Sequence, residues 1–132
     1  MIGLAYLDAS GLVKLVLDEE HSDATRLFVS DARRNVTSRV GAVETVRACL
    51  RRAEGYDAER LGAVLGDVEI VELDRSTGDR AAYLRPPGLR TLDAVHLATA
   101  LELAGDLGAF VTYDERLADA ARTLGLPVVS PR

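Results

Sequence analysis

The stretch Ile-Gly-Leu-Ala-Tyr-Leu-Asp-Ala-Ser, residues 2–10, joins a short apolar strand to the start of an amphipathic helix. The strand is expected at Ile2–Leu7 and the helix at 10–18, with Asp8 between them. A strand that passes directly into a helix is the repeating unit of a parallel α/β sheet. In such a sheet the strand ends and helix starts of one edge surround a single crevice, so Asp8 occupies a position typical of functional side chains.

The rest of the chain repeats this alternation and predicts one α/β layered domain over residues 1–132. Further strands are expected at 35–38, 68–73, 109–112 and 127–129. Helices are expected at 22–32, 39–53, 58–65, 75–84, 92–104 and 115–124. The segment Arg-Pro-Pro-Gly-Leu-Arg at 85–90 is expected to be a loop, because consecutive prolines remove two backbone donors and disfavour helical geometry before them.

Composition indicates an ordinary globular domain. The chain has 132 residues, of which 48% are hydrophobic and 28% charged, enough to bury a core. The single Cys49 has no partner for an internal disulfide, which fits a reducing compartment, and it is expected to be a buried small residue. No basic segment starts the chain, and no apolar run approaches the roughly 18–20 residues that span a bilayer. These features predict a cytoplasmic protein without a membrane partner.

The formal net charge of −5 argues against a protein that coats nucleic acid by bulk attraction. Lys14 is the only lysine among 16 basic residues, and arginine is suited to bidentate phosphate contacts. Most of these arginines are expected on solvated helix faces. The possible phosphate contacts near the expected crevice are Arg47, Arg51, Arg85 and Arg90.

Four carboxylates form the candidate site: Asp8, Glu44, Asp93 and Asp114. Although far apart in sequence, each falls near the end of an expected strand or the start of an expected helix, so the topology predicts that they meet at one edge. Four acids that face one another repel unless cations lie between them. Carboxylate oxygens are the ligands that Mg²⁺ prefers, so a shared metal site is predicted.

Local explanations for Asp8 and Glu44 remain open at this point. Asp8 is also placed to cap the following helix, and Ser10 is placed either to cap that helix instead or to hydrogen-bond to the Asp8 carboxylate. Glu44 lies too deep in its helix for a capping box, and its local alternative is a surface pair with Arg47 at i+3.

Asp93 lies in the first turn of the expected helix 92–104, where the helix dipole favours a negative charge, and this local explanation also remains open. The helix is apolar around nearly its whole circumference and is therefore expected to be buried. An unpaired carboxylate there is costly, and His96 at i+3 is placed to pair with it, bind a water or fill space. Asp114 is also placed to cap the last helix. Thr112 is expected to support the site through its hydroxyl, and Glu115 is a possible substitute ligand.

With these residues laid out, the chain resembles the PIN-domain ribonucleases and, among them, the VapC-type toxins of prokaryotic toxin–antitoxin pairs. The segments that carry the resemblance are Tyr-Leu-Asp-Ala-Ser at 6–10, Ser38 to Arg47 around Glu44, Leu-Asp-Ala-Val-His-Leu-Ala at 92–98 and Val-Thr-Tyr-Asp-Glu-Arg-Leu at 111–117. The last two are the most specific.

The resemblance implies an α/β/α sandwich with a five-stranded parallel sheet and an endoribonuclease that requires Mg²⁺ or Mn²⁺. It implies that Asp8, Glu44, Asp93 and Asp114 are the catalytic, metal-binding acids and that Ser10 and Thr112 support them. It further implies an RNA substrate, a cognate antitoxin and a homodimer. No fifth acid is placed, apart from Glu115 as a candidate.

Rival functions are weakened by missing residues. A phosphorelay receiver domain needs a lysine late in the chain, whereas the only lysine is Lys14. A phosphatase of the haloacid-dehalogenase type needs Asp-x-Asp after the first strand, where this chain has Asp8-Ala9-Ser10. No Gly-rich phosphate loop ending in Lys-Ser or Lys-Thr occurs. A catalytically inert scaffold that binds an antitoxin remains an alternative.

Overall fold

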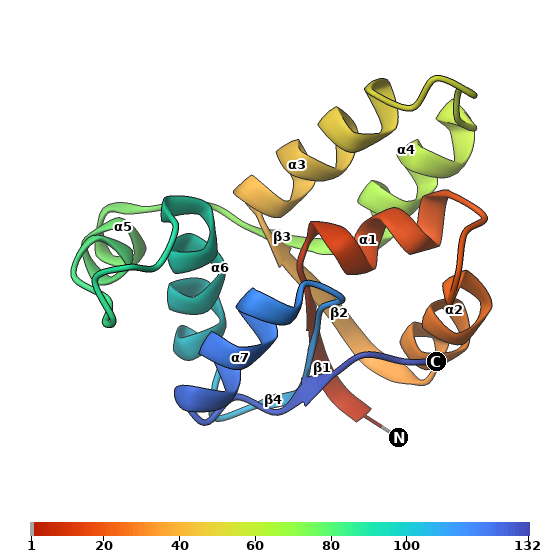
Figure 1. Cartoon of the computed structure of the whole chain (residues 1–132). Coiled ribbons are helices and arrows are strands. Elements are labelled where there is room, and N and C mark those ends of the chain that lie inside the picture. Colours follow the sequence, from red (N-terminus) through yellow and green to blue (C-terminus); the bar gives the residue numbers. More distant parts are fainter. Residues whose placement is uncertain (1) are drawn as a thin grey trace.

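The computed structural model describes residues 2–132 and contains a five-stranded sheet with the strand order β3-β2-β1-β4-β5 (Figure 1). Every neighbouring pair of strands is parallel, as predicted. The first strand of the chain therefore lies at the centre of the sheet. The strands are β1 (Ile2–Leu7), β2 (Ala32–Ser38), β3 (Glu69–Val71), β4 (Leu107–Val111) and β5 (Val128–Val129).

Seven helices within residues 2–132 match the predicted helical runs. They are α1 (Ala9–Val16), α2 (Ser22–Ser30), α3 (Arg39–Leu50), α4 (Ala58–Asp67), α5 (Arg75–Ala82), α6 (Thr91–Glu102) and α7 (Glu115–Thr123). The largest difference lies between α2 and β2. The helix predicted for 22–32 ends at Ser30, and Ala32 instead pairs with Ile2 of β1. Pairing with the central strand extends β2 through the polar Arg33 and Arg34, whose side chains gave no strand signal.

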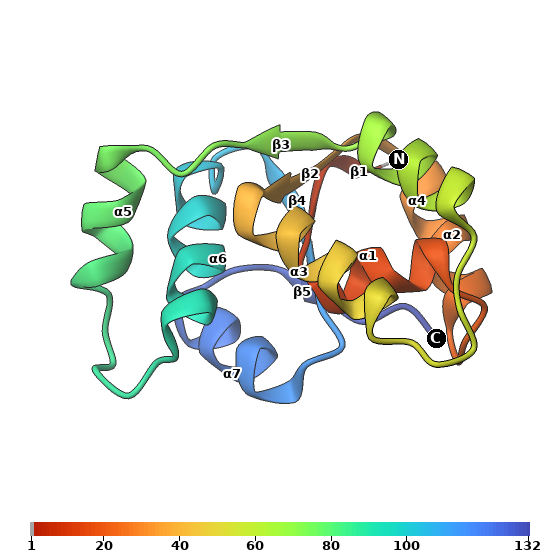
Figure 2. The ribbon, with the colours of Figure 1, turned by 90° about the horizontal axis from the view of Figure 1, so that it is seen from above.

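Helices cover both faces of the sheet, because alternate residues of the central strand point to opposite sides. Leu4 and Tyr6 belong to a core cluster that includes residues of α6 and α7. Ala5 and Leu7 belong to a second cluster that includes residues of α1, α2 and α4. Figure 2 shows the central strands between these two groups of helices. The fold is thus the expected α/β/α sandwich.

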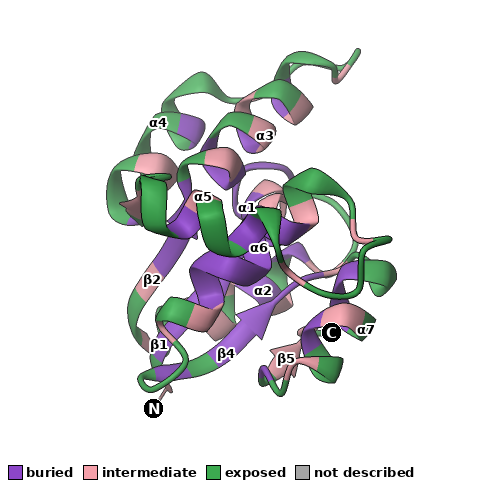
Figure 3. Cartoon of the chain, turned by 90° about the vertical axis from the view of Figure 1, so that its left-hand side faces the viewer, coloured by how far each residue is buried: buried purple, intermediate pink, exposed green. Residues whose placement is uncertain are grey.

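Helix α6 is buried along most of its length, as its apolar sequence predicted. All residues from Ala94 to Ala100 are buried (Figure 3). One side of the helix packs on the sheet, and Ala94, Val95 and Ala98 pack against Ala81 of α5. The start of α6, which carries Asp93, is therefore fixed by packing on two sides.

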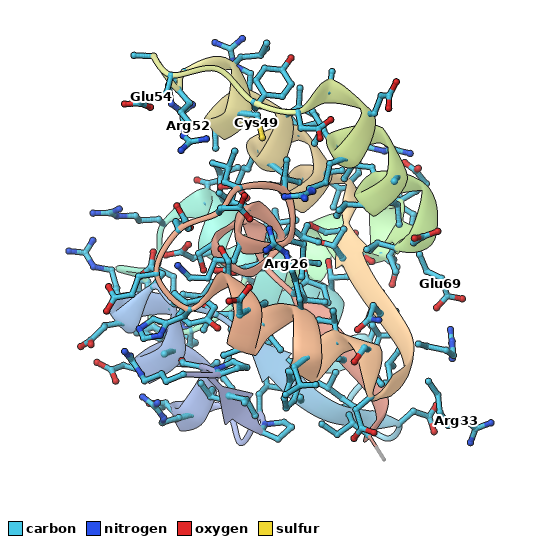
Figure 4. The ribbon with its side chains drawn as sticks, turned by 90° about the vertical axis from the view of Figure 1, so that its right-hand side faces the viewer. Arg26, Arg33, Cys49, Arg52, Glu54 and Glu69 are labelled. Carbon is cyan, nitrogen blue, oxygen red and sulfur yellow. The ribbon has the colours of Figure 1, made fainter. Side chains whose placement is uncertain are left out.

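Cys49 has the buried position predicted for it: its exposed fraction is 0%, and it packs with Val16, Leu17 and Leu61. Figure 4 shows it on α3 on the side that faces α4. Burial raises the pKa of its thiol, so the reactive thiolate is disfavoured. Among residues 2–132, no helix has the length and apolar character that a membrane crossing requires.

Candidate active site

Three neighbouring strands of the sheet end at one rim. Asp8 directly follows β1, Ser38 ends β2 and caps α3, and Thr112 follows β4. Because β1 lies between β2 and β4, the residues that follow these strands lie side by side. This is the edge at which parallel α/β sheets place their ligands.

Asp8 is buried at this rim, with an exposed fraction of 4%. Its Oδ1 accepts hydrogen bonds from the backbone N–H of Gly11 at 3.0 Å and from the Ser10 hydroxyl at 2.6 Å. Its Oδ2 accepts a bond from the Thr112 hydroxyl at 2.6 Å. Asp8 therefore caps α1 and is also the partner of Ser10, so the two possibilities left open by the sequence occur together.

The same two hydroxyls connect Asp8 to the end of β4. The Ser10 hydroxyl accepts a bond from the Tyr113 backbone N–H at 2.8 Å, and that of Thr112 accepts one from the Asp114 N–H at 3.1 Å. Burial raises the pKa of Asp8, while the bonds from Ser10 and Thr112 lower it in part. The network holds the segment after β4 at a fixed position relative to Asp8.

Asp114 lies on the exposed side of the rim and caps α7, because its Oδ1 accepts a bond from the Leu117 N–H at 3.1 Å. Within residues 2–132 its Oδ2 accepts no hydrogen bond. Glu115 is exposed in the first turn of α7. No contact within the described part of the chain links Glu115 to the other acids, so it stays only a candidate ligand.

Glu44 does not form the surface pair with Arg47 that the sequence offered. Its Oε1 lies 2.6 Å from Nε2 of His96, and its side chain is 31% exposed. The reason is that this face of α3 is turned toward α6 rather than toward solvent. The other ring nitrogen of His96, Nδ1, lies 2.6 Å from the Tyr6 hydroxyl. His96 thus binds Glu44 and Tyr6 and makes no hydrogen bond to Asp93.

Asp93 is half-buried, and its carboxylate makes no hydrogen bond or ion pair with any residue in 2–132. Burial raises its pKa most strongly, and the negative charges of Asp114 and Glu44 raise it further. His96 and Arg90 lower the same pKa. Asp93 therefore shares one electrostatic environment with acids from two other parts of the chain.

The rim has the donor chemistry of a hard-cation site, although no ready-made cage is present. Within residues 2–132, no three His, Cys, Asp or Glu side chains are arranged to hold a metal ion as they stand. However, Asp93, Asp114 and Glu44 each have at least one carboxylate oxygen that accepts no hydrogen bond from residues 2–132. Mg²⁺ is usually held by one or two carboxylates together with waters and substrate phosphates, so these residues fit such an ion.

Two residues that shape the site, Tyr6 and Gly41, were not among the candidates predicted from the sequence. Tyr6 lies within an apolar strand, and only the rule that a buried tyrosine hydroxyl needs a partner pointed to a role for it. Gly41 lies where α3 passes closest to His96: a Cβ at this position would lie 3.2 Å from Cε1 of His96 and would collide with the Thr37 hydroxyl. A glycine in the first turn of α3 was the available signal.

Comparison with known proteins agrees with this architecture. A model of the PIN domain family matches residues 5–123. Ribonuclease VapC46 of Mycobacterium tuberculosis is 42% identical over 127 residues, which cover 96% of each chain. Two solved structures share the fold: VapC20 of M. tuberculosis, a toxin that cleaves the sarcin–ricin loop, and a toxin–antitoxin complex from Klebsiella pneumoniae.

The VapC20 structure superposes with a TM-score of 0.71 at 17% identity and covers 96% of this chain and 99% of that one. The Klebsiella structure gives 0.72 at 22% identity, with 97% and 98% covered. These two likenesses are at the level of the fold. The family match over most of the chain and the 42% identity to VapC46 over 96% of its length show family membership as well as fold. The chain belongs to the PIN domain family.

Proposed function

We propose that this protein is an endoribonuclease that requires Mg²⁺ or Mn²⁺ and acts as the toxin of a type II toxin–antitoxin pair. The observation that carries the proposal is the electrostatic environment of Asp93, whose pKa is raised by burial and by the charges of Asp114 and Glu44. Acids crowded in this way favour a bound cation. The ribonuclease name of the relative that is 42% identical supports RNA as the substrate.

Each acid has a stated role in this proposal. Asp8, Glu44, Asp93 and Asp114 hold the cation, and Ser10 and Thr112 fix the orientation of Asp8 through its two oxygens. When bound, a divalent cation supplies a nucleophile at neutral pH by lowering the pKa of a water, and it neutralises charge on the phosphodiester. Cleavage is expected to leave a 5′-phosphate and a 3′-hydroxyl.

Arg90 is the best placed of the four arginines that the sequence offered as phosphate contacts. It precedes α6 and lies close enough to Asp93 to lower the pKa of that carboxylate. Arg47, Arg51 and Arg85 form no ion pair within residues 2–132, but unlike Arg90 they are not among the groups that lower the pKa of Asp93. We assign to Arg90 a contact with an RNA phosphate next to the scissile bond.

The proposal includes two protein partners, a cognate antitoxin that inhibits cleavage and a second copy of the chain in a homodimer. A solved structure with the same fold is a toxin–antitoxin complex, which supports the first partner. A receiver-like function is not favoured, because the only lysine, Lys14, lies early in the chain and its ammonium donates to Glu19 and to the Glu20 carbonyl. An inert antitoxin-binding scaffold is the alternative that an activity assay must exclude.

The test is cleavage by purified protein freed of any inhibitor. RNA, single-stranded DNA and a phosphomonoester are offered with Mg²⁺, with Mn²⁺ and with a chelator. Metal-dependent cleavage of RNA is expected. Cleavage of only the phosphomonoester indicates a phosphatase, and no cleavage of any substrate under all conditions contradicts the proposal.

A pair of capping residues provides a matched control. Asp114 and Asp57 are both exposed and both cap a helix through one carboxylate oxygen, at α7 and at α4. Asparagine caps as well as aspartate, so neither Asp114→Asn nor Asp57→Asn should unfold the protein. Asp114→Asn is expected to reduce cleavage by about 100-fold or more, because losing a ligand should cost at least as much as the roughly 10–100-fold lost with a group that only orients a ligand. Asp57→Asn should leave it unchanged, and equal losses would make both effects structural.

A further inference from the structure

His96 connects the centre of the core to the rim through two short hydrogen bonds. Tyr6, on the central strand, is completely buried and stacks on Phe110 with ring centroids 5.2 Å apart. Its hydroxyl lies 2.6 Å from Nδ1 of His96, and Nε2 of His96 lies 2.6 Å from Oε1 of Glu44. His96 is 2% exposed, whereas the Glu44 side chain is 31% exposed. These contacts thus connect the buried Tyr6 ring, through His96, to the partly exposed carboxylate of Glu44.

For a neutral His96, the two hydrogen bonds determine which ring nitrogen carries the proton. Burial raises the pKa of Tyr6, so its hydroxyl keeps its proton and is available to donate to Nδ1. A neutral histidine that accepts at Nδ1 carries its proton on Nε2. That N–H faces the Glu44 carboxylate, which accepts it. The opposite tautomer would set the bare Nε2 against a carboxylate oxygen, two acceptors with no proton between them.

Glu44 needs such an anchor more than Asp8 and Asp114 do. A glutamate side chain has three rotatable bonds, and ordering it costs more entropy than ordering an aspartate. Asp8 and Asp114 are held by backbone N–H groups at helix starts, but Glu44 lies in the interior of α3 and has no such donor. His96 is the side chain that bonds to it within residues 2–132.

Two further features place His96 at the centre of the acids. Gly41 leaves room for the ring, because a Cβ there would lie only 3.2 Å from Cε1 of His96. His96 also lies close to Asp8 and Asp93, since it is an electrostatic neighbour of both carboxyls. It therefore neighbours three of the four acids while it bonds to one.

We propose that His96, oriented by the Tyr6 hydroxyl, is a positioning residue that holds the Glu44 carboxylate in place for the divalent cation. This inference rests on the proposed function. Groups that orient a metal ligand through a hydrogen bond typically contribute 10–100-fold to metal affinity or activity. His96 acts through Glu44 and touches neither the cation nor the RNA.

Two substitutions of His96 separate positioning from packing. His96→Gln keeps an N–H donor near the position of Nε2, so it still reaches Glu44. His96→Asn keeps a polar group near the position of Nδ1, so it reaches Tyr6 and leaves Glu44 unanchored. Thr99→Val is the control for a buried polar change in α6, since within residues 2–132 the Thr99 hydroxyl bonds only to the Val95 carbonyl one turn back.

The measurement is Mn²⁺ affinity by calorimetry, with RNA cleavage followed in parallel. His96→Asn is expected to weaken Mn²⁺ binding by about tenfold or more, whereas His96→Gln and Thr99→Val retain most of the affinity. Equal affinity for wild type and His96→Asn overturns the inference but leaves the proposed function intact. A wild type that neither binds Mn²⁺ nor cleaves RNA overturns both.

The tautomer gives a second readout that does not depend on metal or activity. In the metal-free protein, nitrogen-15 NMR of the imidazole is expected to show His96 protonated on Nε2. Tyr6→Phe keeps the ring that stacks on Phe110 and removes only the hydroxyl, so the nitrogen-15 shift of Nδ1 should change while Nε2, which faces Glu44, keeps its proton. An Nδ1–H tautomer in the wild type would contradict the orientation on which the inference depends.

Discussion

Asp8 and Asp93 lie at the same rim and both have raised pKa values, yet the protein holds them in opposite ways. Asp8 is almost fully buried, and its two oxygens accept three hydrogen bonds. Asp93 is half-buried and has no hydrogen-bond partner within residues 2–132. Burial is the largest cause of the raised pKa at both, but only Asp93 also has two neighbouring carboxylates among the causes that raise it.

The difference separates two kinds of functional acid. Asp8 is part of the framework, because its bonds to Ser10 and Thr112 join the ends of β1 and β4. Asp93 is held only by the packing of α6, and its ionised form is disfavoured until a cation approaches. The framework acid should therefore matter for folding, whereas the unpaired acid should matter for binding.

Replacing each acid by alanine is expected to give the largest contrast. Asp8→Ala removes a helix cap, which costs about 1 kcal/mol, and leaves buried donors without an acceptor, which costs about 1–3 kcal/mol. The free energy of unfolding should therefore fall by about 2–4 kcal/mol. Asp93→Ala removes an unpaired charge and should cause no comparable loss. Urea denaturation in the presence of a chelator measures both. A large loss for Asp93→Ala would mark it as a structural residue.

The next contrast is the response to metal. A ligand that binds only the folded state at 100 times its dissociation constant stabilises it by about 2.7 kcal/mol. Mn²⁺ should therefore raise the Tm of the wild type, and Asp93→Asn should remove most of this rise. An unchanged Tm across millimolar Mn²⁺ would argue against a cation at the rim.

A smaller effect is expected at the hydroxyl that joins the two sides of the framework. Thr112→Val removes the donor to Asp8 and the acceptor of the Asp114 N–H while keeping the shape of the side chain. Leaving the Asp8 carboxylate without this donor and the Asp114 N–H without this acceptor should lower the free energy of unfolding by about 1–2 kcal/mol. Thr112→Ser, which retains the hydroxyl, is the control. If valine and serine destabilise equally, the methyl packing matters rather than the hydrogen bonds.

The framework acid was easier to predict from the sequence than the contacts of the other acids. Asp8 follows an apolar strand and precedes a helix, and this local pattern predicts its place and makes it a candidate for the helix cap. The partner of Glu44 was missed because His96 lies 52 positions away, on a helix whose orientation depends on packing. The spacing of residues along α3 indicated Arg47 as the partner of Glu44, whereas in the folded chain the partner is His96.

The strand boundaries show the same limit. The apolar core of each strand was visible in the sequence, whereas the polar start of β2 at Ala32 forms because Ile2 of the central strand pairs with it. Sequence patterns record which side chains are buried, but they do not record the pairing that a neighbouring strand imposes. The same reasoning applies to Tyr6, whose hydroxyl has a role only because α6 brings His96 to it.

The smallest expected effect is on the pH dependence of stability. Unfolded Asp93 ionises near its ordinary pKa of 3.8, and folded Asp93 ionises at a higher pH. Between the two pKa values the folded state binds more protons than the unfolded state, so the contribution of Asp93 to stability is lost as pH rises through this window. Asp8 contributes with the same sign, because its pKa is also raised.

Asp93→Asn should therefore gain in Tm relative to the wild type as pH rises from 4 to 7 in a chelator, because the variant no longer carries that charge. The gain should be smaller than the loss in Asp8→Ala, since Asp93 is only half-buried and water screens its charge. Addition of Mn²⁺ at pH 7 should reverse the difference by stabilising only the wild type. A difference in Tm that stays constant with pH would mean that Asp93 is neutralised by a partner in the folded state, and the contrast with Asp8 would disappear.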